Sequence, residues 1–139
     1  MRDLPILGLM LGDATGVGPE QCARVLADGR LRSVARLVVV GDARVLEQGA
    51  RDTGVAVRWR RYAAPRDIDW SDPATPLVDL GNMDPATLRR GKVSAEAGRV
   101  AGETLAAMVK MALAGELDGI TFAPLNKAAL NEGGWRFRV

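Results

Sequence analysis

The chain has 139 residues, of which 47% are hydrophobic and 26% are charged, a composition that predicts one globular domain and excludes a disordered protein. The net charge is only +2 and the basic residues are scattered, so no nucleic-acid-binding surface is expected. There is no histidine, which removes the most common general base and transition-metal ligand.

The location of the protein follows from its apolar runs and its single cysteine. No charged and then apolar leader opens the chain, and the longest apolar runs are too short to span a bilayer. Cys22 has no partner for an intramolecular disulfide and is interpreted as a small buried side chain in a reducing compartment. We therefore expect a cytoplasmic protein without a membrane partner.

Strand and helix patterns alternate along the chain. Continuous apolar runs of strand length, typical of strands buried on both faces, occupy residues 4–11, 37–41, 77–80 and 119–123. Helical patterns cover residues 20–26, 43–51 and 95–114. This alternation predicts an α/β fold with a mainly parallel sheet and flanking helices.

Three segments between these elements are predicted as irregular. Residues 58–66, "RWRRYAAPR", interleave arginines with Trp59 and Tyr62, a pattern that can stack on bases, but we interpret this short patch as a solvated strand end or loop. Residues 63–76 are expected to form an extended connection, and "GNMDPATLRRGK" a loop before the long helix.

The long helix begins with clear signals. Ser94 is a good N-cap, and Glu96 lies in the first turn, where the helix dipole favours negative charge. One face carries small and apolar residues that pack against the core or against a second subunit: Ala97, Ala101, Leu105, Met108 and Ala112. Gly98 and Gly102 inside this helix predict the close approach of another backbone.

The stretch "GDATGVGPE", residues 12–20, follows the first predicted strand. Its glycine spacing matches neither the Rossmann turn nor the P-loop, but Gly18 and Pro19 suit the start of a helix whose free amides attract anionic or carbonyl groups. Asp13 and Glu20 would repel a phosphate unless one points away or meets a metal or a ligand hydroxyl. A glycine-rich turn capped by acids is the alternative.

A second loop, in "DGITFAPLNKAAL", follows the last predicted strand. Asn126 is the expected N-cap of a helix, and Lys127 lies in its first turn, where a cation opposes the helix dipole. We interpret Lys127 either as a contact for an anionic substrate group or a carboxylate, or as a solvated lysine.

Three motifs, "GDATGVGPE", "GKVSAEAGRVAGETL" and "LDGITFAPLNKAALNEGG", closely resemble in order and spacing those of the 4-hydroxythreonine-4-phosphate dehydrogenase family of pyridoxal phosphate biosynthesis. The resemblance runs from about Leu4 to Gly134. It implies an isocitrate/isopropylmalate dehydrogenase-like fold and a homodimer. It also implies NAD or NADP as hydride acceptor, a divalent metal (Zn, Mg or Co), and oxidation with decarboxylation of a small phosphorylated hydroxy acid, 4-phosphohydroxy-L-threonine.

The chain departs from the family pattern at two places. Ala14 and Thr15 replace the usual Pro-Ala, and relatives with this framework oxidise other hydroxy acids or dihydrodiols, so a related substrate stays open. The family continues after "GG" into Gly-His-Thr-Glu, whereas this chain reads "GGWRFRV". We therefore expect residues 1–139 to be a single α/β unit, the incomplete N-terminal portion of a two-domain dehydrogenase, inactive on its own.

The resemblance carries over only to residues that are present. Six positions in the motifs are binding candidates for substrate or cofactor: Asp13, Thr15, Gly16, Gly18, Asn126 and Lys127. No catalytic residue and no metal ligand is assigned, because the family draws its metal-binding histidines from a later segment. A non-catalytic ligand-binding or dimerisation module remains the alternative function.

Overall fold

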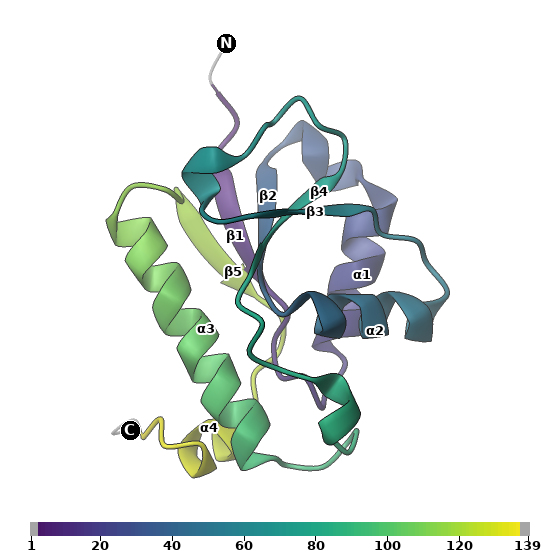
Figure 1. The fold of residues 1–139 in the computed structure, drawn as a ribbon, viewed down its shortest axis with the longest axis vertical. Helices are drawn as coiled ribbons and strands as arrows, with labels where there is room; N and C mark the ends of the chain where they lie inside the picture. The colour runs from purple at the N-terminus through teal and green to yellow at the C-terminus, as the bar shows by residue number, and fades with distance from the viewer. Residues whose placement is uncertain (1–2, 137–139) are drawn as a thin grey trace.

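The computed structural model describes residues 3–136, which form a five-stranded sheet in the order β3-β4-β2-β1-β5 (Figure 1). Every neighbouring pair is parallel, so the predicted parallel α/β sheet is confirmed. The strands are β1 (Ile6–Met10), β2 (Arg36–Gly41), β3 (Trp59–Tyr62), β4 (Thr75–Asp79) and β5 (Gly119–Phe122).

Helices cover both faces of the sheet (Figure 1). On one face, α1 (Gly18–Asp28) packs against α2 (Ala43–Thr53); on the other lies α3 (Ala95–Leu113), against which the short α4 (Lys127–Glu132) packs. Three 3₁₀ turns complete the chain: η1 (Arg30–Ser33), η2 (Pro65–Asp67) and η3 (Pro85–Thr87). Within residues 3–136 no helix has the length and apolar character needed to cross a membrane.

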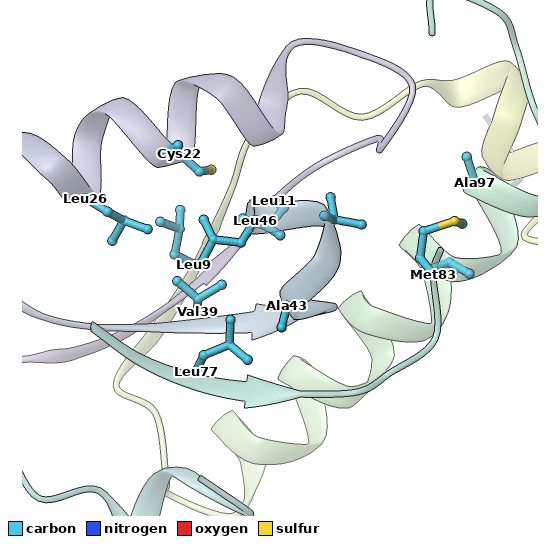
Figure 2. Packing of buried hydrophobic residues seen from close by; sticks show 13 residues of the cluster. Leu9, Leu11, Cys22, Leu26, Val39, Ala43, Leu46, Leu77, Met83 and Ala97 are labelled. Atoms are coloured by element: carbon cyan, nitrogen blue, oxygen red, sulfur yellow. The ribbon is translucent and has the colours of Figure 1, made fainter. Parts of the chain in front are cut away.

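Alternate residues of the central strands face two separate cores. Leu9, Val39 and Leu77 point toward α1 and α2, as Figure 2 shows, and pack against side chains such as Cys22. Val38, Val40, Val78 and Met10 point the other way, toward α3. Because side chains alternate along a strand and both faces are covered, the strands read as unbroken apolar runs, as predicted.

The prediction for residues 58–66 missed a strand. Trp59–Tyr62 form β3, an edge strand that pairs with β4 from Trp59 opposite Thr75 to Tyr62 opposite Val78. Its arginines are exposed, so it lacks the apolar run of a buried strand. β4 also begins earlier than predicted, at Thr75, because Thr75 and Pro76 already pair with β3. Pro76 is tolerated there because β4 pairs with β2 only from Leu77 onward, so no N–H of residue 76 is needed on that side.

The long helix confirms its predicted N-cap and the predicted close approach of a backbone at Gly98, whereas the neighbour of Gly102 is a side chain. The Ser94 hydroxyl accepts a hydrogen bond from the Ala97 amide at 3.2 Å. A Cβ on Gly98 would lie 1.7 Å from the Ala129 carbonyl oxygen of α4, and one on Gly102 would lie 2.1 Å from Nε1 of Trp135. The glycines of α3 therefore let α4 and the following residues pack directly on its backbone.

The apolar face of α3 packs inward. Ala97, Ala101 and Met108 are buried in the core clusters, and Leu105 and Ala112 are partly buried against them. Core packing therefore explains this face, which was the first of the two predicted alternatives.

Candidate functional site

The glycine loop, residues 11–18, leaves the carboxyl end of β1 and ends at Gly18, the first residue of α1. All five strands are parallel, so the segments that follow β2, β4 and β5 leave the same edge of the sheet. Ligands of open parallel sheets bind outside this edge. Each of the three sequence motifs contributes a segment here.

Backbone hydrogen bonds join the three motifs. The Asp13 amide donates to the Pro124 carbonyl at 3.1 Å, which ties the first motif to the third. The Gly91 amide donates to the Thr15 carbonyl at 2.9 Å, which ties the second motif to the first. Motifs separated by up to about a hundred residues in the sequence thus converge at one edge.

Asp13 and Thr15 are turned into the loop itself. Oδ1 of Asp13 accepts hydrogen bonds from the amide and the hydroxyl of Thr15, at 2.8 and 2.6 Å, and both residues are buried. These bonds satisfy the polar groups of a tight turn. The arrangement matches the alternative interpretation, a glycine-rich turn capped by an acid. The same bonds fix the backbone of residues 13–15, which leads into Gly16.

The three glycines of the loop differ in whether their backbone conformation and their neighbours leave room for a side chain. Gly12 has φ +81°, and a Cβ there would lie 2.7 Å from the Pro124 carbonyl oxygen. A Cβ on Gly18 would lie 2.3 Å from the Leu11 carbonyl oxygen. Gly16 lacks a positive φ, and a Cβ there would meet only the Asp13 carbonyl oxygen at 3.5 Å. Packing within the described chain therefore explains Gly12 and Gly18, whereas Gly16 has room for a Cβ, which would make only an ordinary van der Waals contact.

An anion can bind near the glycine loop only if the nearby carboxylates do not repel it, and the Glu20 carboxylate points away from the loop toward Arg90. Its Oε1 pairs with Nη2 of Arg90, while Nη1 of Arg90 pairs with Oδ2 of Asp52 on α2. The negative charge of Glu20 is thus compensated by an arginine. The Asp13 carboxylate is instead engaged inside the turn by the neutral donors of Thr15.

Asn126 and Lys127 occupy the start of α4. The Asn126 side chain accepts from the Ala129 amide at 2.9 Å, so its predicted N-cap role is confirmed. Lys127 is exposed, and in the part of the chain that the structure describes it makes no ion pair. Its ammonium group is available for a ligand.

Lys92 belongs to the second motif but was not among the site residues predicted from the sequence. It follows Gly91, whose amide bonds the glycine loop, so its Cα lies beside that loop. Its side chain is exposed, and across residues 3–136 it has no carboxylate partner. The signal that could have found it resembles the one used for Lys127, a cation at the start of a helix, because Lys92 lies just before the Ser94 N-cap of α3.

Asp42 is a second residue that the sequence did not single out. Its carboxylate caps α2 by accepting from the Arg44 amide at 2.9 Å, and it accepts from the Met83 amide at 2.8 Å. Burial alone would raise the pKa of Asp42, but the bonds from the Arg44 side chain and from both amides, with the arginine's charge, hold that pKa below its ordinary value. Asp42 therefore anchors the segment after β4 to the start of α2.

A cavity of about 30 Å³ lies behind the glycine loop, lined by Gly12, Ala14, Asp42 and Asn82 among others. Oδ1 of Asn82 is buried and has no hydrogen-bond partner among residues 3–136. This volume is enough for about one water molecule. A larger cavity of about 300 Å³ lies at the opposite, amino edge of the sheet, between η1 and residues 70–76, and none of the six predicted site residues lines it.

Residues 3–136 contain no group of three or more His, Cys, Asp or Glu side chains placed to hold a metal ion. Carboxylates at the carboxyl edge are instead engaged in turns, caps and ion pairs, as for Asp13, Asp42 and Glu20. The arrangement provides a loop backbone open at Gly16 and two exposed lysine cations, which suits an anionic ligand.

The chain is thus an α/β unit with a parallel sheet, whose glycine loop meets two further loops at the edge where such sheets bind ligands. Residues 33–138 match the family model described as pyridoxal phosphate biosynthetic protein PdxA, and the chain belongs to this family. The predicted family and its isocitrate dehydrogenase-like fold are thereby confirmed.

Relatives and solved structures agree with this assignment. The D-threonate 4-phosphate dehydrogenase of Cupriavidus necator is 38% identical over 134 residues, which are 96% of this chain and 40% of that protein. The crystal structure of a 4-hydroxythreonine-4-phosphate dehydrogenase from Burkholderia phymatum superimposes with a TM-score of 0.91 at 33% identity, over 99% of this chain and 42% of that one.

A second such dehydrogenase, from Klebsiella pneumoniae, superimposes with a TM-score of 0.86 at 32% identity, over 96% of this chain and 40% of that one. These relatives are named as dehydrogenases, and the chain spans about 40% of their length.

Proposed function

We propose that this chain forms the substrate-binding edge of a dehydrogenase that oxidises a small phosphorylated hydroxy acid, with decarboxylation, in pyridoxal phosphate biosynthesis. The observation that carries the proposal is the convergence of the three motifs through the Asp13–Pro124 and Gly91–Thr15 backbone bonds. Membership of the PdxA family and the activities in the relatives' names support it.

Five residues have tasks in this proposal. Gly16 lets the anionic group of the substrate approach the loop backbone, because a side chain there would occupy the open space in front of it. Lys127 and Lys92 supply positive charge to the phosphate or carboxylate. Asp13 and Thr15 keep the loop in the required conformation through their mutual hydrogen bonds.

The hydride acceptor in this proposal is NAD or NADP, which removes hydride from the substrate carbon that bears the hydroxyl. The divalent metal expected for the family does not fit the described residues alone, since residues 3–136 provide no cluster of three ligating side chains. We propose that the 139-residue chain by itself binds substrate without turnover and that the enzyme is a homodimer.

Two substrates share the chemistry that this edge recognises. 4-Phosphohydroxy-L-threonine and D-threonate 4-phosphate both carry a phosphate, a carboxylate and at least one hydroxyl group, and the relatives' names divide between them. They differ in the amino group, which is cationic in the first and absent in the second. Comparing the two affinities therefore identifies the preferred substrate.

Calorimetric titration of the chain with each compound tests the proposal. Lys127→Met should weaken the preferred ligand about tenfold or more, the effect of losing a charge-assisted hydrogen bond. Lys110→Met removes the same charge from the exposed far end of α3 and should leave the affinity unchanged. Equal effects of the two substitutions, or no binding by the unmodified chain, would contradict the proposed function.

A further inference from the structure

The segment between β4 and α3, residues 81–94, runs past the glycine loop and is called the strap below. The Met83 amide donates to the Asp42 carboxylate, which holds the first part of the strap to the start of α2. Leu88 packs against the core cluster under α1 and α2. Beyond Leu88, residues 89–93 are all exposed, so another kind of contact must hold the part of the strap that reaches the site.

That contact is made by Arg90. Its two terminal nitrogens reach different helices: Nη2 pairs with Glu20 in the first turn of α1, and Nη1 pairs with Asp52 near the end of α2. The guanidinium is planar and carries two outward-facing NH₂ groups, which suits one arginine to two carboxylates. Lysine, with a single charged atom, lacks this fork.

The two carboxylates are placed side by side by the packing of α1 on α2. A Cβ on Gly49 of α2 would lie 2.4 Å from the Pro19 carbonyl oxygen, so α2 contacts the first turn of α1 backbone to backbone. Asp52 is held further by Gln48, whose Nε2 donates to Asp52 Oδ1 at 2.7 Å. Glu20 and Asp52 would repel each other without a cation between them.

The next residue connects this ion-pair group to the candidate site. The Gly91 amide donates to the Thr15 carbonyl at 2.9 Å, and the Thr15 side chain is bonded to Asp13. Fixing Arg90 therefore fixes Gly91, and Gly91 fixes the backbone immediately before Gly16. The same placement sets Lys92 beside the glycine loop.

We propose that Arg90 is a positioning residue of the candidate site: its guanidinium clasps the strap to α1 and α2, so that Gly91 holds the Thr15–Gly16 backbone in the conformation that the glycine loop presents to a ligand. Its importance for the reaction rests on the proposed function, because the glycine loop must bind the substrate for its conformation to affect it. The hydrogen-bond and ion-pair geometry of the clasp does not depend on that function.

Amide hydrogen exchange, measured by NMR on the 139-residue chain, tests the clasp. Arg90→Gln should speed exchange of the Gly91 amide about three- to tenfold, the range expected from losing a partly exposed ion-pair network. Arg89→Gln is the matched control, since Arg89 is an exposed neighbour in the strap and makes no ion pair within residues 3–136. The Met83 amide is the internal reference and should exchange at the same rate in every variant, because Asp42 holds it independently.

Three further results separate the clasp from general loosening. Arg90→Lys should recover part of the Gly91 protection, and raising the salt concentration should speed Gly91 exchange in the unmodified chain but not in Arg90→Gln. In a titration with 4-phosphohydroxy-L-threonine, Arg90→Gln should weaken binding while Arg89→Gln should not. Unchanged Gly91 exchange in Arg90→Gln would overturn the clasp, and faster exchange with unchanged affinity would overturn its positioning role. Absence of binding by the unmodified chain would instead refute the proposed function.

Discussion

Replacing Gly18 and Gly16 separately by alanine distinguishes a glycine required by packing from one that faces a ligand. The two positions lie in the same loop, two residues apart, and neither has a positive φ. A Cβ on Gly18 would lie 2.3 Å from the Leu11 carbonyl oxygen and 3.0 Å from the Ala123 Cβ. A Cβ on Gly16 would meet only the Asp13 carbonyl oxygen, at 3.5 Å.

The magnitude follows from these distances. Non-bonded heavy atoms prefer a separation of about 3.5 Å, so Gly18→Ala must move α1 away from the end of β1 by about 1 Å. Such overpacking costs about 1–3 kcal/mol, and the higher helix propensity of alanine offsets up to about 1 kcal/mol. A net loss of about 1–2 kcal/mol lowers the melting temperature by about 4–8 °C in a domain of this size.

Gly16→Ala should leave the stability unchanged or raise it by about 0.4–1 kcal/mol, because alanine restricts the unfolded chain and meets no clash. Urea denaturation followed by circular dichroism measures both free energies of unfolding. Substrate affinity of Gly16→Ala, measured by calorimetry, should fall although its stability does not. Equal destabilisation by the two substitutions would refute the assignment of Gly16 to a ligand-facing position.

Two further predictions concern buried groups that titrate. Asp42→Asn should destabilise the chain by about 1–3 kcal/mol at pH 7, because the neutral asparagine amide cannot accept from both backbone donors and lacks the carboxylate's charge. The control Asp84→Asn, at a half-exposed cap of η3, should cost less. The folded-state pKa of Asp42 is lowered, so its contribution to the free energy of unfolding is full above about pH 4–5 and is lost as the pH falls through that pKa. The denaturation curves of the unmodified chain and of Asp42→Asn should therefore converge in acid. A stability difference that does not shrink as the pH falls below the ordinary range of a carboxyl pKa would contradict this. Burial raises the pKa of the Cys22 thiol to about 12, so iodoacetamide at about pH 8 should label the native chain far more slowly than the urea-unfolded chain. Equal labelling rates would show that Cys22 is accessible.

The buried strands could be predicted because both faces of the sheet are covered. Val38, Val39 and Val40 face opposite cores in turn, so the sequence is apolar at every position. The edge strand β3 could not be predicted in this way, because Arg60 and Arg61 point to solvent and pair with Asp72 and Asp79. A charged strand stabilised by ion pairs and one neighbour lacks a local apolar signal.

The site was only partly predictable for a similar reason. Helix caps such as Ser94 and Asn126 are local, within three residues of the amide they accept from, and both were predicted correctly. The contacts of Arg90 join residues 38 and 70 positions away, and nothing in the local sequence indicates such partners. Likewise, the spacing of Gly12, Gly16 and Gly18 did not reveal that only the first and last are explained by contacts within the described chain.

The most direct test of the central claim, that the three motifs form one ligand site, is an NMR titration of the ¹⁵N-labelled chain with 4-phosphohydroxy-L-threonine. We predict that shifted backbone amides cluster in residues 12–18, 91–94 and 125–127, at the carboxyl edge of the sheet. Shifts confined to the larger cavity at the amino edge, around Gly29, Ala35 and Ala74, or no shifts at all, would contradict the claim.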